Sequence, residues 1–359
     1  MHIVLLAAFS RLLVIGFALL SSWVFAPYDS SGQFVSSNVL SPLANWDGAH
    51  FLHVARSGYR FEHSFAFFPG FPMIVNVLAR WMDHVTAAVL LSNVCFVVAA
   101  HVLCLLCGRR AAVLFLISPA NIFFSAAYTE SLFALLLFLG CFFLERRAHV
   151  SACAAFFASA VVRSNGAVFA ILLLVRGEIV LACVVGVPFV LQNLKCALLF
   201  CVHDSQPWCF KGWIPNCYGH VQSFYWNNGF LAYWTWNNVP NFLLAVPMLF
   251  LASLVARRAW KSKAHALSSL ETQLNSMVAL LALLCLFSMN VQVGRKKNKM
   301  VLFGLNFTNQ VMTRFLAVFP NIYAEASKAT GFGRKLVIAY FVGYSCLGCL
   351  LFPTFYPWT

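Results

Sequence analysis

The chain has 359 residues, of which 62% are hydrophobic and only 9% are charged, and its mean hydropathy is +0.81. Soluble domains are about half apolar and about a quarter charged, so this composition excludes a soluble protein and a disordered chain. The apolar runs are continuous and about as long as a bilayer is thick, which argues against the short alternating strands of a membrane β-barrel. We therefore expect residues 1–359 to form one all-α, polytopic membrane domain.

The positive charge of the chain is not distributed like a nucleic-acid-binding surface. The net charge is +14, but Lys and Arg lie in short clusters between apolar runs, such as Arg109-Arg110, Arg146-Arg147 and Arg257-Arg258. Such clusters are typical of the determinants that fix membrane topology. We therefore expect no nucleic-acid partner, and we expect these three pairs to lie on the cytoplasmic side together with the N-terminus.

The apolar runs predict about nine or ten membrane spans. The first run, residues 3–25, is too long for the core of a signal peptide and has no small-residue cleavage site before Pro27. We therefore expect a span there rather than a cleaved leader. The further expected spans are 85–107, 111–127, 129–145, a broken pair at 149–162 and 166–176, 178–202, 239–256, 273–293 and 335–352, with 311–326 left undecided.

Two segments, residues 26–84 and 203–238, are too polar to cross the membrane and fall together on the side opposite the arginine pairs. Five of the ten acidic residues lie in them, namely Asp29, Asp47, Glu62, Asp83 and Asp204. The second segment is rich in Trp and Tyr, including Tyr225 and Trp226. Such side chains hold sugars and lipid headgroups, but they also form ordinary membrane-interface belts. We expect this face of the membrane to carry the function.

The 13 cysteines do not indicate a disulfide-rich scaffold, because most of them lie inside apolar runs, where Cys is a small packing residue. Cys346 and Cys349 form a Cys-x-x-Cys pair within such a run, and packing is the favoured interpretation there too. Cys209 and Cys217 lie instead in the polar segment 203–238, and a disulfide between them stays open if this segment faces an oxidising compartment.

The densest group of polar side chains follows Trp46, where Asp47, His50 and His53 occur at intervals of three residues. On a helix that begins near Asp47, these three side chains lie along one face. A carboxylate with two imidazoles at the lipid–water boundary suits a general base beside an anion site. The alternative is that Asp47 only caps the N-terminus of an interfacial helix over residues 48–56.

Two further polar positions interrupt the apolar runs. Glu130 lies where two expected spans meet, and an ionisable group at membrane depth is a candidate functional residue, although helix capping is a competing interpretation. The sequence Arg163-Ser164-Asn165-Gly166 breaks one long apolar run, and polar groups at the tip of such a hairpin must face protein or water. Arg163 is therefore a candidate for holding a phosphate, or else for an ion pair with Glu130.

Several common motifs are absent from the sequence, which contains no Asp-x-Asp pair, no Gly-rich phosphate loop and no His-Glu-x-x-His. Their absence argues against nucleotide-powered transport and zinc proteolysis. We therefore expect an enzyme without a metal site or cofactor, which uses an activated substrate delivered by the membrane.

The chain resembles the family of GPI mannosyltransferase 2, the PIG-V family, from residue 11 to its end. The motifs that carry the resemblance are WDGAHFLH at 46–53, FAFFPGFP at 65–72, SPANIFFSAAYTESLFA at 118–134, RSNG at 163–166, IPNxYxxVQxxYWxxGFLxY at 214–233, VPNFLLAxP at 239–247 and the terminal PWT. The resemblance implies a GT-C type transmembrane helix bundle whose first lumenal loop, residues 26–84, contains interfacial helices. It also implies a multi-pass enzyme of the endoplasmic reticulum membrane with a lumenal active site.

The activity implied is transfer of mannose from dolichyl-phosphate mannose to the first mannose of the growing GPI anchor, in α1,6 linkage. The implied partners are this donor, the mono-mannosylated glucosaminyl-phosphatidylinositol acceptor and the bilayer, and an accessory membrane subunit is a further candidate. In the family, a Trp-Asp pair of the first lumenal loop is thought to include the catalytic base, which assigns that role to Asp47. The candidate substrate-binding residues are Trp46, His50, His53, Glu130, Arg163, Asn165, Tyr225 and Trp226.

Two alternatives of other kinds stay open at this point. Another dolichyl-phosphate-sugar transferase would share the architecture and differ only in its acceptor. A polytopic transporter should show paired broken helices in two sequence-similar halves, and the sequence has no such internal repeat.

One stretch, residues 294–310, departs from the family pattern, in which the motif VQV is directly followed by a Thr-Arg-Phe-Leu segment. Here the stretch separates Val293 from that segment and places four basic residues on the expected lumenal side, against the positive-inside bias. We interpret it as a retained intron or else a lineage-specific loop. Sequencing of mature transcripts is expected to show a message without this stretch. Its presence in every mature message would contradict the intron and leave the loop.

Overall fold

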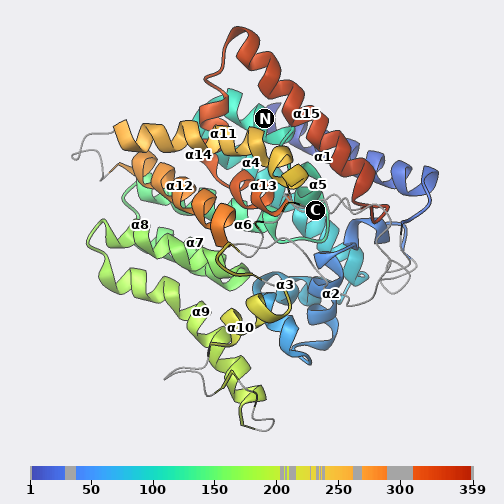
Figure 1. Ribbon diagram of the computed structural model, residues 1–359, viewed down its shortest axis with the longest axis vertical. Coiled ribbons are helices and arrows are strands. Elements are labelled where there is room, and N and C mark those ends of the chain that lie inside the picture. Colours follow the sequence, from blue (N-terminus) through green and yellow to red (C-terminus); the bar gives the residue numbers. More distant parts are fainter. Residues whose placement is uncertain are drawn as a thin grey trace.

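A computed structural model describes residues 2–28, 38–202, 206, 208–209, 216–226, 228–231, 234, 236, 239–261, 269–288 and 310–356. Within these ranges all regular secondary structure is helical, as the sequence predicts (Figure 1). The stretch 294–309, Asp29, Asp204 and the terminal residues 357–359 lie outside the described residues.

The helices follow one another with short connections. In chain order they are α1 (His2–Val24), η2 (Ser41–Ala44), α2 (Asp47–Ser57), η3 (Glu62–Ala66), α3 (Gly70–Leu78), α4 (His84–Leu116), α5 (Asn121–Ser125), α6 (Glu130–Glu145), α7 (His149–Val162), η4 (Ser164–Phe169), α8 (Ala170–Leu174), α9 (Ile179–Phe200), α10 (Cys217–Phe224), α11 (Val239–Lys261), α12 (Leu270–Ser288), α13 (Gln310–Ala317), α14 (Pro320–Ala326) and α15 (Gly331–Leu351).

Six of the described helices are long and apolar enough to cross a membrane, namely α1, α4, α9, α11, α12 and α15. The chain is thus a multi-pass membrane protein. The expected spans at 129–145, 149–162 and 166–176 form shorter helices, the longest being α6 with 16 residues, whereas a straight crossing needs about 20 residues. The number of full-length spans among the described helices is therefore smaller than the nine or ten expected.

Helix α4 is two helical limbs that fold back on each other at Gly108. The rings of Phe96 and Phe115 stack with their centroids 4.5 Å apart. In a straight helix these residues would be about 28 Å apart, since 19 residues each rise about 1.5 Å. Gly108 has φ +82°, a conformation that side-chain-bearing residues rarely adopt. The boundary expected between the spans 85–107 and 111–127 is therefore confirmed, but the second span is broken after Leu116 by the turn that contains Pro119.

Arg11 of α1 supplies hydrogen-bond donors at this break. Its side chain is buried, and its guanidinium donates to the carbonyl oxygen of Leu116 at 3.3 Å and to Ser125 Oγ at 2.9 Å. The guanidinium carbon also lies 3.6 Å from the centroid of the Phe96 ring. Backbone carbonyls freed inside a membrane need partners within the protein. Arg11 thereby fixes α1 against the broken segment that leads into residues 128–130.

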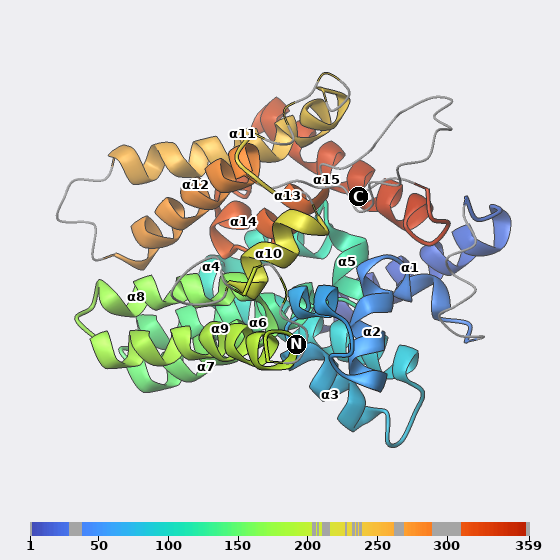
Figure 2. The same ribbon diagram turned by 60° about the horizontal axis from the view of Figure 1, so that its bottom comes forward.

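The helices that carry the remaining polar motifs pack at backbone contact. A Cβ atom on Gly166 would lie 2.4 Å from the backbone carbon of Ser159 in α7. A Cβ on Gly70, at the start of α3, would lie 3.0 Å from the carbonyl group of Val161, which also belongs to α7. Both glycines therefore hold their segments, η4 and α3, directly against α7 (Figures 1 and 2).

The two polar segments lie on the same side of the molecule. Helix α10 packs against η3 of the first segment and against the end of α9. Helix α2, Asp47–Ser57, includes all the residues of the helix predicted over 48–56. The described parts of 26–84 and 203–238 thus form one face, as the sequence predicts.

The close approach of Gly166 to α7 gives the first structural prediction. Gly166→Ala forces a methyl group into the Ser159 backbone and is expected to destabilise the protein by about 1–3 kcal/mol. The measurement is the thermal unfolding temperature in detergent, together with the amount of protein in the membrane. Gly186→Ala in α9 is the matched control, because a Cβ there meets nothing within 4 Å. Equal stability of the two variants would contradict the packing described here.

Candidate functional site

Asp47 is the first residue of α2 and is presented by an unusual turn. Trp46, the residue before it, has φ 60° and ψ −127°, in a region that non-glycine residues rarely adopt. The turn is supported by the Asn45 amide, which donates to the carbonyl oxygen of Pro353 at 2.9 Å, and by the Trp46 ring, which packs on Phe355 at 5.6 Å. The N-cap position belongs to Trp46, so the alternative that Asp47 caps the helix is wrong.

Tyr128 fixes the backbone of the same turn from the opposite side. Its hydroxyl oxygen accepts a hydrogen bond from the Asp47 backbone N–H at 3.0 Å and donates one to the Asn45 carbonyl oxygen at 3.2 Å. The Tyr128 side chain is fully buried just before α6. The carboxylate of Asp47 is thus held at a defined position without taking part in helix capping.

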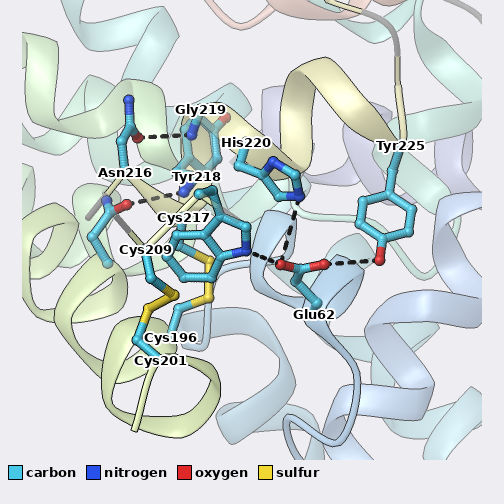
Figure 3. Close-up of a disulfide and its surroundings, with 12 residues drawn as sticks. Glu62, Cys196, Cys201, Cys209, Asn216, Cys217, Tyr218, Gly219, His220 and Tyr225 are labelled. Atoms are coloured by element: carbon cyan, nitrogen blue, oxygen red, sulfur yellow. Dashed lines mark hydrogen bonds and ion pairs between the residues drawn. A yellow bond between two sulfur atoms is a disulfide. The ribbon is translucent and has the colours of Figure 1, made fainter. Parts of the chain in front are cut away.

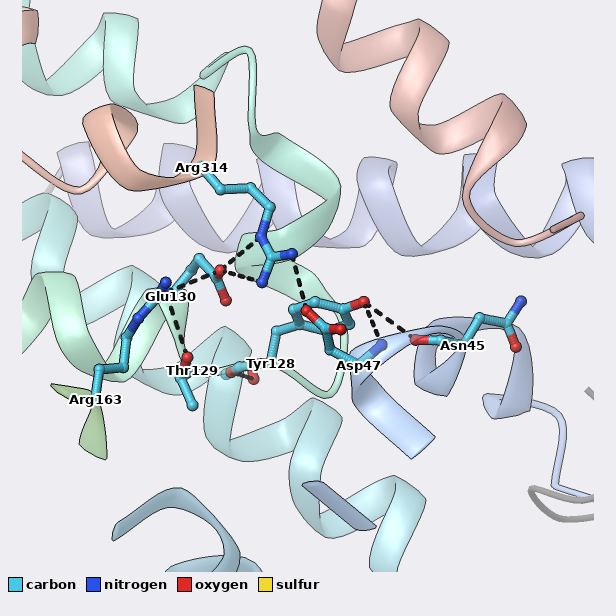
Figure 4. Close-up of polar contacts among 8 residues, drawn as sticks. Asn45, Asp47, Tyr128, Thr129, Glu130, Arg163 and Arg314 are labelled. Atoms are coloured by element: carbon cyan, nitrogen blue, oxygen red, sulfur yellow. Dashed lines mark hydrogen bonds and ion pairs between the residues drawn. The ribbon is translucent and has the colours of Figure 1, made fainter. Parts of the chain in front are cut away.

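The Asp47 carboxylate enters a chain of alternating charges (Figure 4). Arg314 Nη1 lies 3.0 Å from Asp47 Oδ2, and Arg314 Nε lies 2.8 Å from Glu130 Oε1. Arg163 Nη1 lies 2.9 Å from the same Glu130 oxygen. The side chain of Glu130 is 0% exposed and that of Arg314 is 8% exposed, whereas that of Asp47 is 27% exposed. The network of two carboxylates and two guanidinium groups is therefore buried at one end and open at Asp47.

Aromatic rings cover the guanidinium groups of this network. The Arg314 guanidinium carbon lies 4.5 Å from the ring centroid of Phe123 and 4.8 Å from that of Tyr128. That of Arg163 lies 4.6 Å from the ring of Phe315. Ring faces attract cations and keep water away from them, which strengthens the ion pairs they cover.

The histidines of α2 belong to a neighbouring aromatic wall. The ring of His50 stacks on Phe67 at 4.8 Å and meets His63 edge-on at 5.7 Å. Burial lowers the pKa of His50, and the nearby Asp47 offsets part of this effect. His53 stacks on Phe61 at 5.6 Å, and its buried Nε2 has no hydrogen-bond partner in the part of the chain described. A largely neutral His50 is thus available as a hydrogen-bond donor beside Asp47.

Glu62 joins the two polar segments (Figure 3). It accepts a hydrogen bond from the indole N–H of Trp208 and another from the Tyr225 hydroxyl at 2.9 Å, and His220 Nε2 lies 3.6 Å away. Burial and Glu62 raise the pKa of Tyr225 to about 12. Trp226 extends the contact, because its ring centroid lies 5.9 Å from that of Phe67. Tyr225 and Trp226 are therefore beside the His50 wall, on the face that carries Asp47.

Two disulfides fix the second polar segment to the end of α9 (Figure 3). They join Cys196 to Cys217 and Cys201 to Cys209. A pairing of Cys209 with Cys217 is therefore wrong, because each has a closer partner at the end of α9. Disulfides persist in oxidising compartments, and the position of this end of the bundle on the non-cytoplasmic side stays a prediction.

Of the other residues predicted for the site, some belong to the ion-pair network of Asp47 and others lie around it. Glu130 and Arg163 form the expected ion pair and are brought together with Asp47. Asn165 lies in η4, and its buried side-chain oxygen has no partner among the described residues. Arg314 was missed by sequence reasoning, although an arginine within the largely apolar segment 311–326 was a signal. The described residues contain no group of three or more His, Cys, Asp or Glu side chains that could hold a metal ion.

Comparisons with known proteins show which family and which proteins this chain resembles. A family model described as mannosyltransferase (PIG-V) matches residues 17–180 and 170–359. GPI mannosyltransferase 2 of Yarrowia lipolytica is 28% identical over 356 residues, which cover 92% of this chain and 92% of that protein. GPI alpha-1,6-mannosyltransferase 2 of Mus musculus is 33% identical over 294 residues, covering 63% of this chain, and the human protein of that name is 33% identical over 302 residues, covering 66%.

The matched parts differ in extent between relatives. The alignment spans 59% of the mouse protein and 60% of the human protein, so the chain spans about three fifths of these two relatives. No solved structure gives a significant match to the chain.

The disulfide pattern is open to direct measurement. Peptide mapping of the unreduced protein is expected to show Cys196 joined to Cys217 and Cys201 joined to Cys209. Alkylation of these four thiols should therefore require prior reduction, whereas Cys183, which is exposed and unpaired, serves as the control thiol. A crosslinked peptide joining Cys209 to Cys217, or free thiols at all four positions, would contradict the described arrangement.

Proposed function

Because this chain belongs to the PIG-V family of mannosyltransferases, we propose that it transfers the second mannose of the GPI anchor. The donor would be dolichyl-phosphate mannose, the acceptor the mono-mannosylated glucosaminyl-phosphatidylinositol, and the new linkage α1,6. The observation that carries the proposal is the family match across residues 17–359, together with the partly exposed carboxylate of Asp47 at the open end of a buried ion-pair network.

The proposed reaction is a single displacement with inversion at the anomeric carbon of the donor. A β-linked donor gives an α-linked product in one step, so the reaction needs one base and no covalent sugar–enzyme intermediate. The acceptor 6-hydroxyl oxygen bonds to mannose C1 while its proton passes to Asp47. The bond between C1 and the phosphate oxygen breaks, and dolichyl phosphate leaves with the electron pair.

The position of Asp47 supports the role of general base. One carboxylate oxygen, Oδ2, is held by Arg314, whereas Oδ1 has no partner among the described residues. A base must come within hydrogen-bond reach of the hydroxyl that it deprotonates. A carboxylate that is anchored through one oxygen and open at the other meets this need.

The substrate contacts that we propose lie around this oxygen. His50, His53 and Arg163 would contact the donor phosphate or the acceptor, because a hydrogen-bond donor or cation steadies the negative charge of the leaving group. Trp46, Tyr225 and Trp226 would stack on sugar rings, and Asn165 would bind through its unpartnered oxygen. Glu130 touches two arginines and is fully buried, so it would influence substrates through them. We propose no metal and no cofactor for this step.

The proposed location is the endoplasmic reticulum membrane, with the site in the lumen. The two disulfides support an oxidising compartment on this side, and the arginine pairs of the sequence favour the opposite side as cytoplasmic. Both lipid substrates would reach Asp47 from the bilayer. An accessory membrane subunit stays a prediction.

A transferase with another acceptor is the remaining alternative. The relatives named GPI mannosyltransferase 2 favour the GPI precursor, and the family match disfavours a transporter. The assay that tests the proposal combines the membrane-embedded chain with labelled dolichyl-phosphate mannose and mono-mannosylated precursor. A labelled precursor that carries a second, α1,6-linked mannose is the expected product. No transfer to this acceptor, with transfer to another glycan, would contradict the proposal.

The Asp47→Asn substitution tests the base. Asn keeps the size of Asp but cannot accept the acceptor proton, so the transfer rate is expected to fall by roughly 10²–10⁴-fold. The rate is measured in the same assay at equal protein levels in the membrane. Asp83→Asn is the matched control, because Asp83 caps α4 by accepting from the backbone N–H groups of Val85 and Thr86. Asn caps helices about as well as Asp, so this control should keep its activity.

Near-normal transfer by a well-expressed Asp47→Asn variant would remove the base assignment. Glu62 would then be the next described carboxylate of this face to test, although Trp208 and Tyr225 already engage both of its oxygens.

A further inference from the structure

Arg314 lies between two carboxylates and uses different edges of its guanidinium for each. Nη1 faces Asp47 at 3.0 Å, and Nε and Nη2 face Glu130 Oε1, each at 2.8 Å. A planar guanidinium with several donors suits such a bridge, which a lysine ammonium cannot reproduce. The three residues come from α2, α6 and α13, so the bridge also fixes the relative position of these helices.

A base that is paired with a cation faces two opposing requirements. The cation keeps the carboxylate ionised and oriented, but it also lowers the affinity of that carboxylate for a proton. A second carboxylate on the other side of the cation shares its charge and restores part of that affinity. Glu130 has this position, and the N-terminal turn of α6, where it lies, favours a negatively charged side chain.

We propose that Glu130 is a positioning residue that acts through Arg314 to orient Asp47 and to keep it basic enough to accept the acceptor proton. Arg314 is the intermediary that holds Asp47 Oδ2. The inference rests on the proposed function, since it concerns the base of that reaction.

The burial of Glu130 favours this role over direct contact with substrate. Its side chain is 0% exposed, and Oε1 is shared by Arg314 and Arg163. Its other oxygen, Oε2, is buried without a partner among the described residues. Asp47 is instead 27% exposed, so the network offers the substrate one of its two carboxylates.

The charged and titratable groups around Asp47 come from several elements. Arg314 reaches it from α13 and Tyr128 from the turn before α6, while His50 and His53 lie on α2 itself and His63 lies on η3. These three histidines are the same in every variant that keeps α2 and η3 intact. Their contribution therefore cancels when variants are compared with the wild type.

The test is the acidic limb of the pH–rate profile of mannose transfer. In Glu130→Gln the amide oxygen can still accept from Arg314, but its negative charge is gone, so the full charge of Arg314 acts on Asp47. The acidic limb is expected to move to lower pH, by on the order of one unit. The plateau rate should fall about three- to tenfold because a weaker base removes the proton less readily, with an unchanged KM for the donor.

Arg314→Gln is expected to move the limb in the opposite direction. The carboxylate of Asp47 then has no arginine beside it and faces the negative charge of Glu130. Arg163→Gln should move the limb in the same direction as Arg314→Gln. Without Arg163, the negative charge of Glu130 is balanced only by Arg314, so less of the positive charge of Arg314 acts on Asp47.

Glu178→Gln is the matched control for loss of a carboxylate. Glu178 pairs with His149 between α8 and α9, outside this network, and its profile should match that of the wild type.

Protein level in the membrane and the unfolding temperature are measured for each variant, so that loss of fold is separated from loss of basicity. Where Glu130→Gln does not accumulate, Arg163→Gln decides the question. The inference would be overturned if the acidic limb of the variant that accumulates stayed where it is in the wild type. It would also be overturned if the acidic limb of Glu130→Gln moved in the same direction as that of Arg314→Gln. A wild-type chain without mannose transfer would instead contradict the proposed function.

Discussion

The buried bridge from Asp47 through Arg314 to Glu130 is the interaction on which the rest of the site depends. Arg314 and Asp47 are 267 positions apart in the sequence, so the bridge forms only when the first polar segment, α6 and α13 are packed together. Removing one partner of a buried ion pair typically destabilises a protein by about 3–5 kcal/mol, because it leaves an uncompensated charge. The surrounding fold therefore has to deliver these charges to one place.

Other features of the structure serve that placement. Arg11 satisfies the carbonyls of the helix break that precedes Tyr128, and Gly166 lets η4, the segment that follows Arg163, pack against α7. The Tyr128 hydroxyl then fixes the backbone of the Asp47 turn. On the open side, Glu62 and the disulfides hold the aromatic second segment next to the His50 wall. The site is thus rigid on its protein side and open toward the face where lipid-borne substrates would arrive.

The sequence predicted the parts of this arrangement that depend on local pattern. Apolar runs predicted most helices, the helix after Trp46 is confirmed, and of the two interpretations of Arg163 the ion pair with Glu130 is observed. The fold-back of α4 at Gly108 lies at the boundary expected between two spans, whereas the helices at 129–145, 149–162 and 166–176 are shorter than a straight crossing needs. The role of Arg314 and the disulfide partners of Cys209 and Cys217 depend on contacts between distant segments, which no local periodicity reports.

The most direct test of this account is a structure of the chain with dolichyl-phosphate mannose, or an unreactive analogue of it, and the mono-mannosylated acceptor bound. The account predicts the acceptor 6-hydroxyl oxygen within about 2.6–3.2 Å of a carboxylate oxygen of Asp47, with Arg314 still on Oδ2 and Glu130 behind it. An acceptor hydroxyl placed against another carboxylate, with Asp47 turned away from both substrates, would contradict it.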